Sequence, residues 1–331
     1  MKNKLKLFGT QIRRICAVAL VAVIGFVAAA CGGDGDQTMV WTAVTDSTFD
    51  NEYIHAIAYG NGKFVAGGDL GKMAYSTDGV AWTAVPISTF TTSTIIAIAY
   101  GNDKFVAGGD LGKMAYSTDG VTWAVVSDSK FGTSDIVSIA YGNGKFVAVG
   151  NSGKMTYSTD GVNWTAVTQS AFGSSYNIYA ITYGNNKFIA GGYDSSNTIG
   201  KMAILTDGTN WTDALNNTFE SSYINAITYG GEKFVAVGGD GKIATSTNGV
   251  TWTAVAQNAF GSSGIFAIAY SGGKFVAVGE KGKTAASTDG KTWTAVKQGV
   301  FGASNPIYAI AYGNKKFVAG GAGIIAYLSD N

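Results

Sequence analysis

Cysteine and histidine are scarce in this chain, which narrows the chemistry that it could perform. Its 331 residues include two cysteines, Cys16 and Cys31, and a single histidine, His55. Any catalytic site that depends on histidine would have to use His55, and no nucleophile motif lies near it. We therefore expect His55 on the surface without a catalytic role, and we predict no catalytic residue, no metal site and no cofactor.

Arginine is nearly absent, since Arg13 and Arg14 are the only two in the chain. The sequence has 23 Lys+Arg against 22 Asp+Glu, and these two arginines with Lys2, Lys4 and Lys6 lie at its N-terminus. Without those five residues, 18 basic residues face 22 acidic ones, which is a net charge of −4. Proteins that bind nucleic acids usually carry a basic surface, so we predict no nucleic-acid partner.

The N-terminus holds the one long apolar run, sixteen residues from Ile15 to Ala30 that end at Cys31. This is shorter than the roughly 20 residues that span a bilayer as a helix, and it is typical of an export signal. Ala28 to Cys31 resembles the lipobox of bacterial lipoproteins, although leucine is usual where Ala28 stands. The resemblance implies a lipoprotein signal peptide at 1–30, a diacylated Cys31 and a short linker at 31–38.

A lipid on Cys31 would anchor the protein to a membrane of a bacterial cell envelope, and we expect the outer membrane or cell surface. Ordinary cleavage at the A-x-A sequence is the alternative. In either case one cysteine at most remains after cleavage, so no intramolecular disulfide can form.

Tryptophan marks a tandem repeat. The seven tryptophans are spaced by 41, 41, 41, 47, 41 and 41 residues. They are Trp41, Trp82, Trp123, Trp164, Trp211, Trp252 and Trp293. Repeats of about 40 residues are typical of β-propeller blades.

One repeat, Ala56 to Val85, contains four short apolar stretches separated by turns that carry glycine. Asn61-Gly62 and Asp78-Gly79 are dipeptides that favour tight hairpins, and no stretch has helical periodicity. We predict an all-β fold over 39–331, a seven-bladed β-propeller with four antiparallel strands in each blade. The N-terminal strand, Trp41 to Val44, should complete the last blade and close the ring; a solenoid is the alternative.

The segment Ser76 to Trp82, which returns at Ser117 to Trp123, resembles the Asp-box of sialidase-like (BNR) propellers of secreted bacterial lipoproteins. Its spacing is one residue shorter than usual. The chain also resembles, more distantly, the photosystem II assembly-factor propellers. The resemblance implies that the box stabilises a turn between the third and fourth strands. The box residues here are Asp78, Asp119, Asp160, Asp207, Asn248 and Asp289.

Enzymatic activity is not predicted. Sialidases hold the substrate carboxylate with three arginines, and this chain has no arginine after Arg14. Residues 56–80 and 97–121 are identical except that Gly62 is replaced by Asp103, whereas an active site needs unlike residues. A carbohydrate-active enzyme that uses paired carboxylates, in the manner of glycoside hydrolases, remains the alternative.

The connections from blade to blade and from the second to the third strand should share one face, here called the long-loop face. The hairpins should share the opposite face, the hairpin face. Six extra residues between Trp164 and Trp211 fall on the long-loop face. The candidate binding residues there are Tyr176, Asn177, Tyr193, Asp194, Ser195, Ser196 and Asn197.

We expect Tyr193 to be exposed and this face to bind a protein or glycan partner, with the protein itself a monomer. A lysine precedes the third strand in six repeats and is expected to be solvated. These lysines are Lys72, Lys113, Lys154, Lys201, Lys242 and Lys283.

Overall fold

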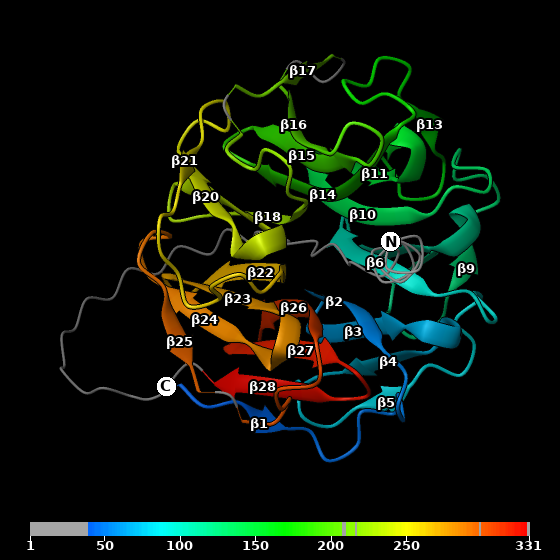
Figure 1. Ribbon diagram of the computed structural model, residues 1–331. Coiled ribbons are helices and arrows are strands. Elements are labelled where there is room, and N and C mark those ends of the chain that lie inside the picture. The colour runs from blue at the N-terminus through cyan, green and yellow to red at the C-terminus, as the bar shows by residue number, and fades with distance from the viewer. Residues whose placement is uncertain (1–38, 207–209, 216, 298, 330–331) are drawn as a thin grey trace, which may run out of the picture.

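The computed structural model describes residues 39–206, 210–215, 217–297 and 299–329. These residues form seven four-stranded antiparallel sheets arranged as blades around a central axis (Figure 1). The prediction of a seven-bladed β-propeller is confirmed. The signal peptide, the linker and Cys31 lie outside the described residues.

Each blade runs from an inner strand at the axis to a short outer strand at the rim of the ring. The inner strands are β2 (Ile54–Gly60), β6 (Ile95–Gly101), β10 (Ile136–Gly142), β14 (Tyr176–Gly184), β18 (Ile224–Gly230), β22 (Ile265–Ser271) and β26 (Ile307–Gly313). The second strands are β3 (Lys63–Gly68), β7 (Lys104–Gly109), β11 (Lys145–Gly150), β15 (Lys187–Asp194), β19 (Lys233–Gly238), β23 (Lys274–Gly279) and β27 (Lys316–Gly321).

The third strands are β4 (Met73–Ser76), β8 (Met114–Ser117), β12 (Met155–Ser158), β16 (Ile199–Leu205), β20 (Ile243–Ser246), β24 (Thr284–Ser287) and β28 (Ile325–Ser329). The outer strands are β5 (Thr83–Ala84), β9 (Ala124–Val125), β13 (Thr165–Ala166), β17 (Trp211–Asp213), β21 (Thr253–Ala254), β25 (Thr294–Val296) and β1 (Thr42–Ala43). Five blades carry a 3-10 turn between the second and third strands: η1 (Asp69–Gly71), η2 (Asp110–Gly112), η3 (Asn151–Gly153), η4 (Gly239–Gly241) and η5 (Glu280–Gly282).

The hydrophobic core consists of layers between neighbouring blades. In one layer, Phe49, Ile57 and Phe64 of the first blade pack against Ala311 and Val318 of the last. Since each sheet buries both faces in this way, its strands are rich in apolar residues throughout instead of alternating with polar ones.

A glycine at the end of the inner strand lets consecutive blades approach closely. A Cβ atom added to Gly60 would lie 2.0 Å from Cγ of Tyr100, and Gly101 meets Tyr141 in the same way. The tyrosine that ends each Ala-Ile-Ala-Tyr tetrad, or its variant, is thus a partly buried contact between blades.

The N-terminal strand closes the ring. β1 pairs with β28, with Thr42 opposite Tyr327 and Ala43 opposite Ala326. Trp41 is buried, its indole Nε1 donates a hydrogen bond of 3.2 Å to Thr284 of the sixth blade, and its ring meets Phe301 at 5.9 Å. The strand at the start of the described chain therefore fastens the last blade to its neighbour (Figure 1).

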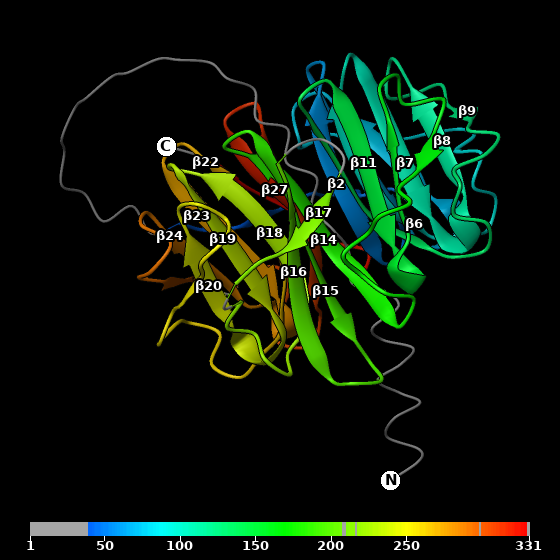
Figure 2. The same cartoon turned by 90° about the horizontal axis from the view of Figure 1, so that it is seen from above.

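The two faces, seen in Figure 2, differ in loop length. The connection between β5 and β6, for example, runs over 85–94 on the long-loop face, whereas the hairpin between β2 and β3 on the opposite face has two residues, 61–62.

No helix in the described ranges is long and apolar enough to cross a membrane.

Candidate functional site

The Asp-box residues stabilise turns in the blades where they are described. In the first blade, the Asp78 carboxylate accepts hydrogen bonds from the backbone N–H groups of Val80 and Ala81 at 2.8 and 2.9 Å, and Ser76 donates a third. Asp119, Asp160 and Asp289 accept the same set of bonds, and Asn248 repeats it with its amide oxygen. Asp207 lies outside the described residues. These five side chains are thus occupied by their own turns.

The lysines before the third strands fix the long loops. Lys72, Lys113, Lys154, Lys242 and Lys283 each donate from Nζ to the backbone oxygen of a buried phenylalanine in the preceding connection, at 2.6 to 3.2 Å. Lys201 pairs with Asp213 at 2.9 Å. We expected these lysines to be solvated, and the sequence did not predict this contact. The phenylalanine oxygen approaches the lysine Nζ only when the blade-to-blade connection folds back over the blade.

The insertion in the fourth blade extends two paired strands beyond the length seen in the other blades. Tyr176 and Asn177 of β14 lie opposite Asp194 and Tyr193 of β15, so the structure brings these four predicted residues together. Asp194 is buried and accepts hydrogen bonds from the Ser196 N–H and the Asn197 side chain, both at 2.8 Å. The exposed tip is therefore 195–199, and Asp194 serves to hold it.

Tyr193 is not exposed as expected. Only 7% of its surface is accessible, because the side chain turns toward the axis and lies against Tyr223, with ring centroids 3.9 Å apart. The prediction of exposure assumed that Tyr193 lies in a loop, because its neighbours in the sequence are polar. Tyr193 instead belongs to the lengthened strand β15.

All seven inner strands carry a bulge, where the register with the neighbouring strand shifts by one; it lies at the second residue of six of these strands and at the fourth residue of the longer β14. The bulge residues differ from blade to blade, although the positions around them are nearly constant. They are His55, Ile96, Val137, Tyr179, Asn225, Phe266 and Tyr308. Ile96, Val137, Tyr179 and Tyr308 share one buried cluster although they come from four blades, which places this set on the axis.

Aromatic rings dominate one side of the axis at the long-loop face. Tyr193 and Tyr179 meet Tyr223, Phe266 stacks on Tyr308 at 5.2 Å, and Tyr308 meets Tyr53 at 5.6 Å. We call these six residues of blades four to seven and one the aromatic arc. Tyr53, Tyr223 and Phe266 are only half-buried, so the arc reaches the surface.

The other side of the axis carries polar groups. His55 is completely buried, contrary to the expectation of a surface position, and its Nε2 lies 2.8 Å from the Asp69 carboxylate. The Thr94 hydroxyl donates to Asp69 at 3.2 Å, and the Thr94 N–H donates to Asp110 at 3.3 Å. Asp135 continues the series in the third blade.

Asp135 accepts hydrogen bonds of 2.9 Å from the Leu111 N–H and from the side chain of Asn151. We call His55, Asp69, Thr94, Asp110, Asp135 and Asn151 the polar arc. Burial raises the pKa of the Asp110 carboxyl, and the negative charge of Asp135 raises it further. The carboxylates of the polar arc are therefore close enough to repel each other.

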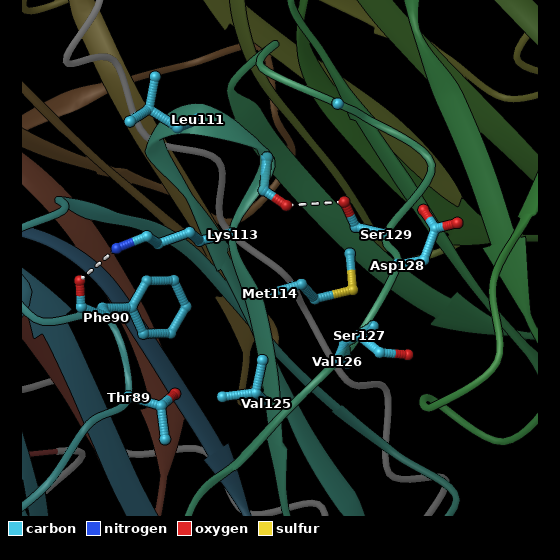
Figure 3. Close-up of a pocket in the computed structure, with 12 residues that line it drawn as sticks. Thr89, Phe90, Leu111, Lys113, Met114, Val125, Val126, Ser127, Asp128 and Ser129 are labelled. Atoms are coloured by element: carbon cyan, nitrogen blue, oxygen red, sulfur yellow. Dashed lines mark hydrogen bonds between the residues drawn. The ribbon is translucent and has the colours of Figure 1, made fainter.

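An open pocket of about 320 Å³ lies farther out on the second blade, between the connections that precede and follow this blade (Figure 3). Phe90, Met114 and Val126 line it together with Leu111 and Val125, which are 60% and 64% exposed. Figure 3 shows Lys113 bonded to the Phe90 oxygen on one side and Ser129 donating to the Gly112 oxygen on the other. The pocket thus has fixed walls and an apolar lining that is partly open to solvent.

No group of three or more His, Cys, Asp or Glu side chains is arranged to hold a metal ion within the described part of the chain. The residues near the axis offer carboxylates, hydroxyls and aromatic rings, which suit recognition of another molecule.

A family model described as the DUF6242 beta propeller domain matches residues 168–297. No curated protein sequence matches the chain. Among solved structures, the chain is similar to YCF48 bound to a D1 peptide, with 18% identity, a TM-score of 0.68 and coverage of 88% of this chain and 95% of that one.

YCF48 from Cyanidioschyzon merolae is similar at 19% identity and a TM-score of 0.66, covering 87% of this chain and 98% of that one. The WD40 beta propeller domain of Doa1 is similar at 12% identity and a TM-score of 0.67, covering 88% and 98%. These identities support a shared fold and carry no activity across. The predicted resemblance to photosystem II assembly-factor propellers is confirmed at the level of the fold by YCF48, whereas the resemblance to sialidase-like propellers stays a prediction.

Proposed function

We propose that this protein is an exported, lipid-anchored, non-enzymatic scaffold that binds a polypeptide partner through its long-loop face. The observation that carries the proposal is a pair of exposed leucines held in an unfavourable backbone conformation. Leu70 and Leu111 have φ angles of 55° and 57° and are 52% and 60% exposed.

A leucine in the left-handed region costs about 1 kcal/mol, and exposure means that packing within the protein does not compensate for it. The same position is Ser152, Asp240 and Lys281 in other blades, so the fold itself does not require an apolar side chain there. Strained residues that the fold does not need often take part in function. The exposed Ile87, in the connection between these two blades, and the exposed Val125, which lines the pocket of Figure 3, add apolar surface.

Two further observations favour a polypeptide over a glycan. Glycans are commonly bound on exposed aromatic rings, and Tyr193, which was expected to supply one, is buried. One similar propeller has been solved with a peptide bound. The anchor at Cys31 is proposed from the lipobox resemblance alone, and labelling with a radioactive fatty acid before and after Cys31→Ser would test it.

The leucines can be tested with Leu70→Asn combined with Leu111→Asn. Asparagine tolerates the left-handed conformation well, so the double variant should fold at least as stably as the wild type. Capture of partners from native envelope extract, quantified against wild type, should fall by about fivefold or more.

Leu215→Asn is the matched control, because Leu215 is 61% exposed but belongs to a different part of the ring. Capture that is unchanged in the double leucine variant would refute the proposed surface. Turnover of a glycoside by the purified protein would instead favour the carbohydrate-active enzyme.

A further inference from the structure

We call the long-loop end of the central axis, lined by the polar arc, the aromatic arc and Asn225, the axial mouth. Two buried side-chain atoms in it lack a hydrogen-bond partner. His55 Nε2 faces the Asp69 carboxylate, and because an ionised carboxylate only accepts, this nitrogen must carry the proton. In the neutral ring Nδ1 is then an acceptor, and it has no hydrogen-bond partner although it is fully buried. On the opposite side of the axis, Asn225 donates through Nδ2 to the Ile265 oxygen while its buried Oδ1 also lacks a partner.

Asp69 of the polar arc pairs with His55, whereas Asp110 and Asp135 have no such basic partner within the described ranges. The six lysines that precede the third strands point elsewhere, five to phenylalanine oxygens and Lys201 to Asp213. A ligand that supplies positive charge and N–H groups would therefore complement Asp110 and Asp135, and the unpaired atoms of His55 and Asn225 leave this region without donors of its own to take that place.

Aromatic rings complete the site. The aromatic arc faces the polar arc across the axis, and His55 lies 5.4 Å from the Tyr308 ring and 6.2 Å from the Tyr53 ring. A cation held beside aromatic faces gains electrostatic attraction to their π electrons. Carboxylates on one side and aromatic rings on the other form an environment suited to an ammonium or guanidinium group.

We propose that the axial mouth binds a lysine or arginine side chain of a polypeptide, with Asp110 and Asp135 as the charged contacts and Tyr53, Tyr223 and Phe266 as the aromatic ones. This inference depends on the proposed function in one respect, because it takes the ligand to be a polypeptide. It uses side chains other than Leu70 and Leu111, but Leu111 follows Asp110 in η2 and its N–H donates to Asp135, so partner capture is measured for the aspartate variants as well.

The experiment uses short synthetic peptides of equal length, with both ends blocked, that differ at one central residue. The residue is lysine, arginine, acetyl-lysine, norleucine or glutamate, and affinity for the purified protein is measured by calorimetry. Lysine and arginine peptides should bind about tenfold more tightly than norleucine and acetyl-lysine peptides, and added salt should remove most of the difference.

Asp110→Asn combined with Asp135→Asn should reduce the affinity for the lysine peptide by about tenfold. The control is Asp103→Asn combined with Glu232→Gln, which removes the same charge from two exposed turns on the hairpin face. Tyr53→Leu provides a second, independent variant at a half-buried position, in case the aspartate pair is needed for folding. It should weaken binding of the lysine peptide more than binding of the norleucine peptide.

Equal binding of the lysine and norleucine peptides, or full affinity in a folded Asp110 and Asp135 double variant, would overturn the inference. Neither outcome would affect capture of a partner through Leu70 and Leu111. Conversely, normal partner capture by the double leucine variant would refute the proposed docking surface and leave the axial mouth untouched.

Discussion

At the scale of single residues, the Asp-box shows how one side chain can hold a turn in repeat after repeat. Burial of the Asp119 carboxylate opposes its ionisation, but hydrogen bonds from the N–H groups of Thr122 and Val121 and from Ser117 outweigh burial and lower its pKa to about 2. The pKa values of Asp160 and Asp289 are also far below the ordinary value, for the same reason. Asn248 shows that a neutral amide can adopt the same geometry.

This depression of the pKa predicts a pH dependence of stability. An aspartate ionises near pH 3.9 when unfolded, so the stabilising contribution of Asp119 is fully present above that pH and is lost as the pH falls through about 2. Asp119→Asn should fold, because of the Asn248 precedent, with an unfolding free energy lower by about 0.5 to 1 kcal/mol at neutral pH after screening by solvent. Urea denaturation between pH 6 and pH 2 should show a smaller loss for the variant than for the wild type, and parallel losses would contradict the assignment.

At the scale of elements, the lysine that precedes the third strand in five blades ties the preceding blade-to-blade connection to that strand. Lys154 Nζ donates to the Phe131 oxygen at 2.6 Å, and the Ser134 N–H shares that acceptor. The long loops are therefore ordered by a contact that spans 23 residues of sequence.

Lys154→Met should loosen the connection at 127–135 while leaving the blades intact. The expected result is faster amide hydrogen exchange in this connection and a loss of about 1 kcal/mol in unfolding free energy. Lys130→Met, in the same connection, is the control, because Lys130 pairs only with the exposed Asp128. Equal exchange in the two variants would show that the contact with Phe131 does not order the loop.

The arrangement of the strands in blades could be predicted from the sequence, but the residues at the axis could not. The tryptophan spacing and the turn dipeptides predict the number of blades and the strand order, because both depend on local patterns that repeat. The axial mouth was not predicted. His55 and Ile96 lie one position before the segments 56–80 and 97–121, whose near identity suggested blades without individual chemistry.

An alignment of the seven repeats would have revealed that the bulge position varies. His55, Asn225 and Phe266 occupy this position, and the residues on either side of it are nearly the same in every repeat. Their meeting at one point could not be derived from a single repeat. It follows from ring closure, which brings the bulge residue of every inner strand to the axis, and from the bulge itself, which turns that side chain away from the layers between blades.

At the scale of the whole molecule, stability depends on closing the ring, because an open propeller would expose the edges of its first and last sheets. The N-terminal segment contributes few contacts to this closure: two residue pairs between β1 and β28, the bridge between Val40 and Lys297, the Val44 N–H donating to the Ile325 oxygen, and the buried Trp41 between the last two blades. The two-residue strand is short, so Trp41 is the main anchor of the closing segment.

Removal of residues 39–44 should therefore lower the melting temperature and cause aggregation. Trp41→Ala should reproduce much of the effect, with a loss of about 3 to 5 kcal/mol in unfolding free energy, because it removes buried area, the Thr284 hydrogen bond and the contact with Phe301. The matched comparison is Trp82→Ala, since Trp82 is also buried but donates to Gly79 within its own turn. Both tryptophan variants should be destabilised, but only the Trp41 variant and the deletion should gain exposed strand edges, measured as thioflavin-positive aggregates below the melting temperature. A deletion variant that melts like the wild type would mean that the seven blades hold together without the N-terminal strand.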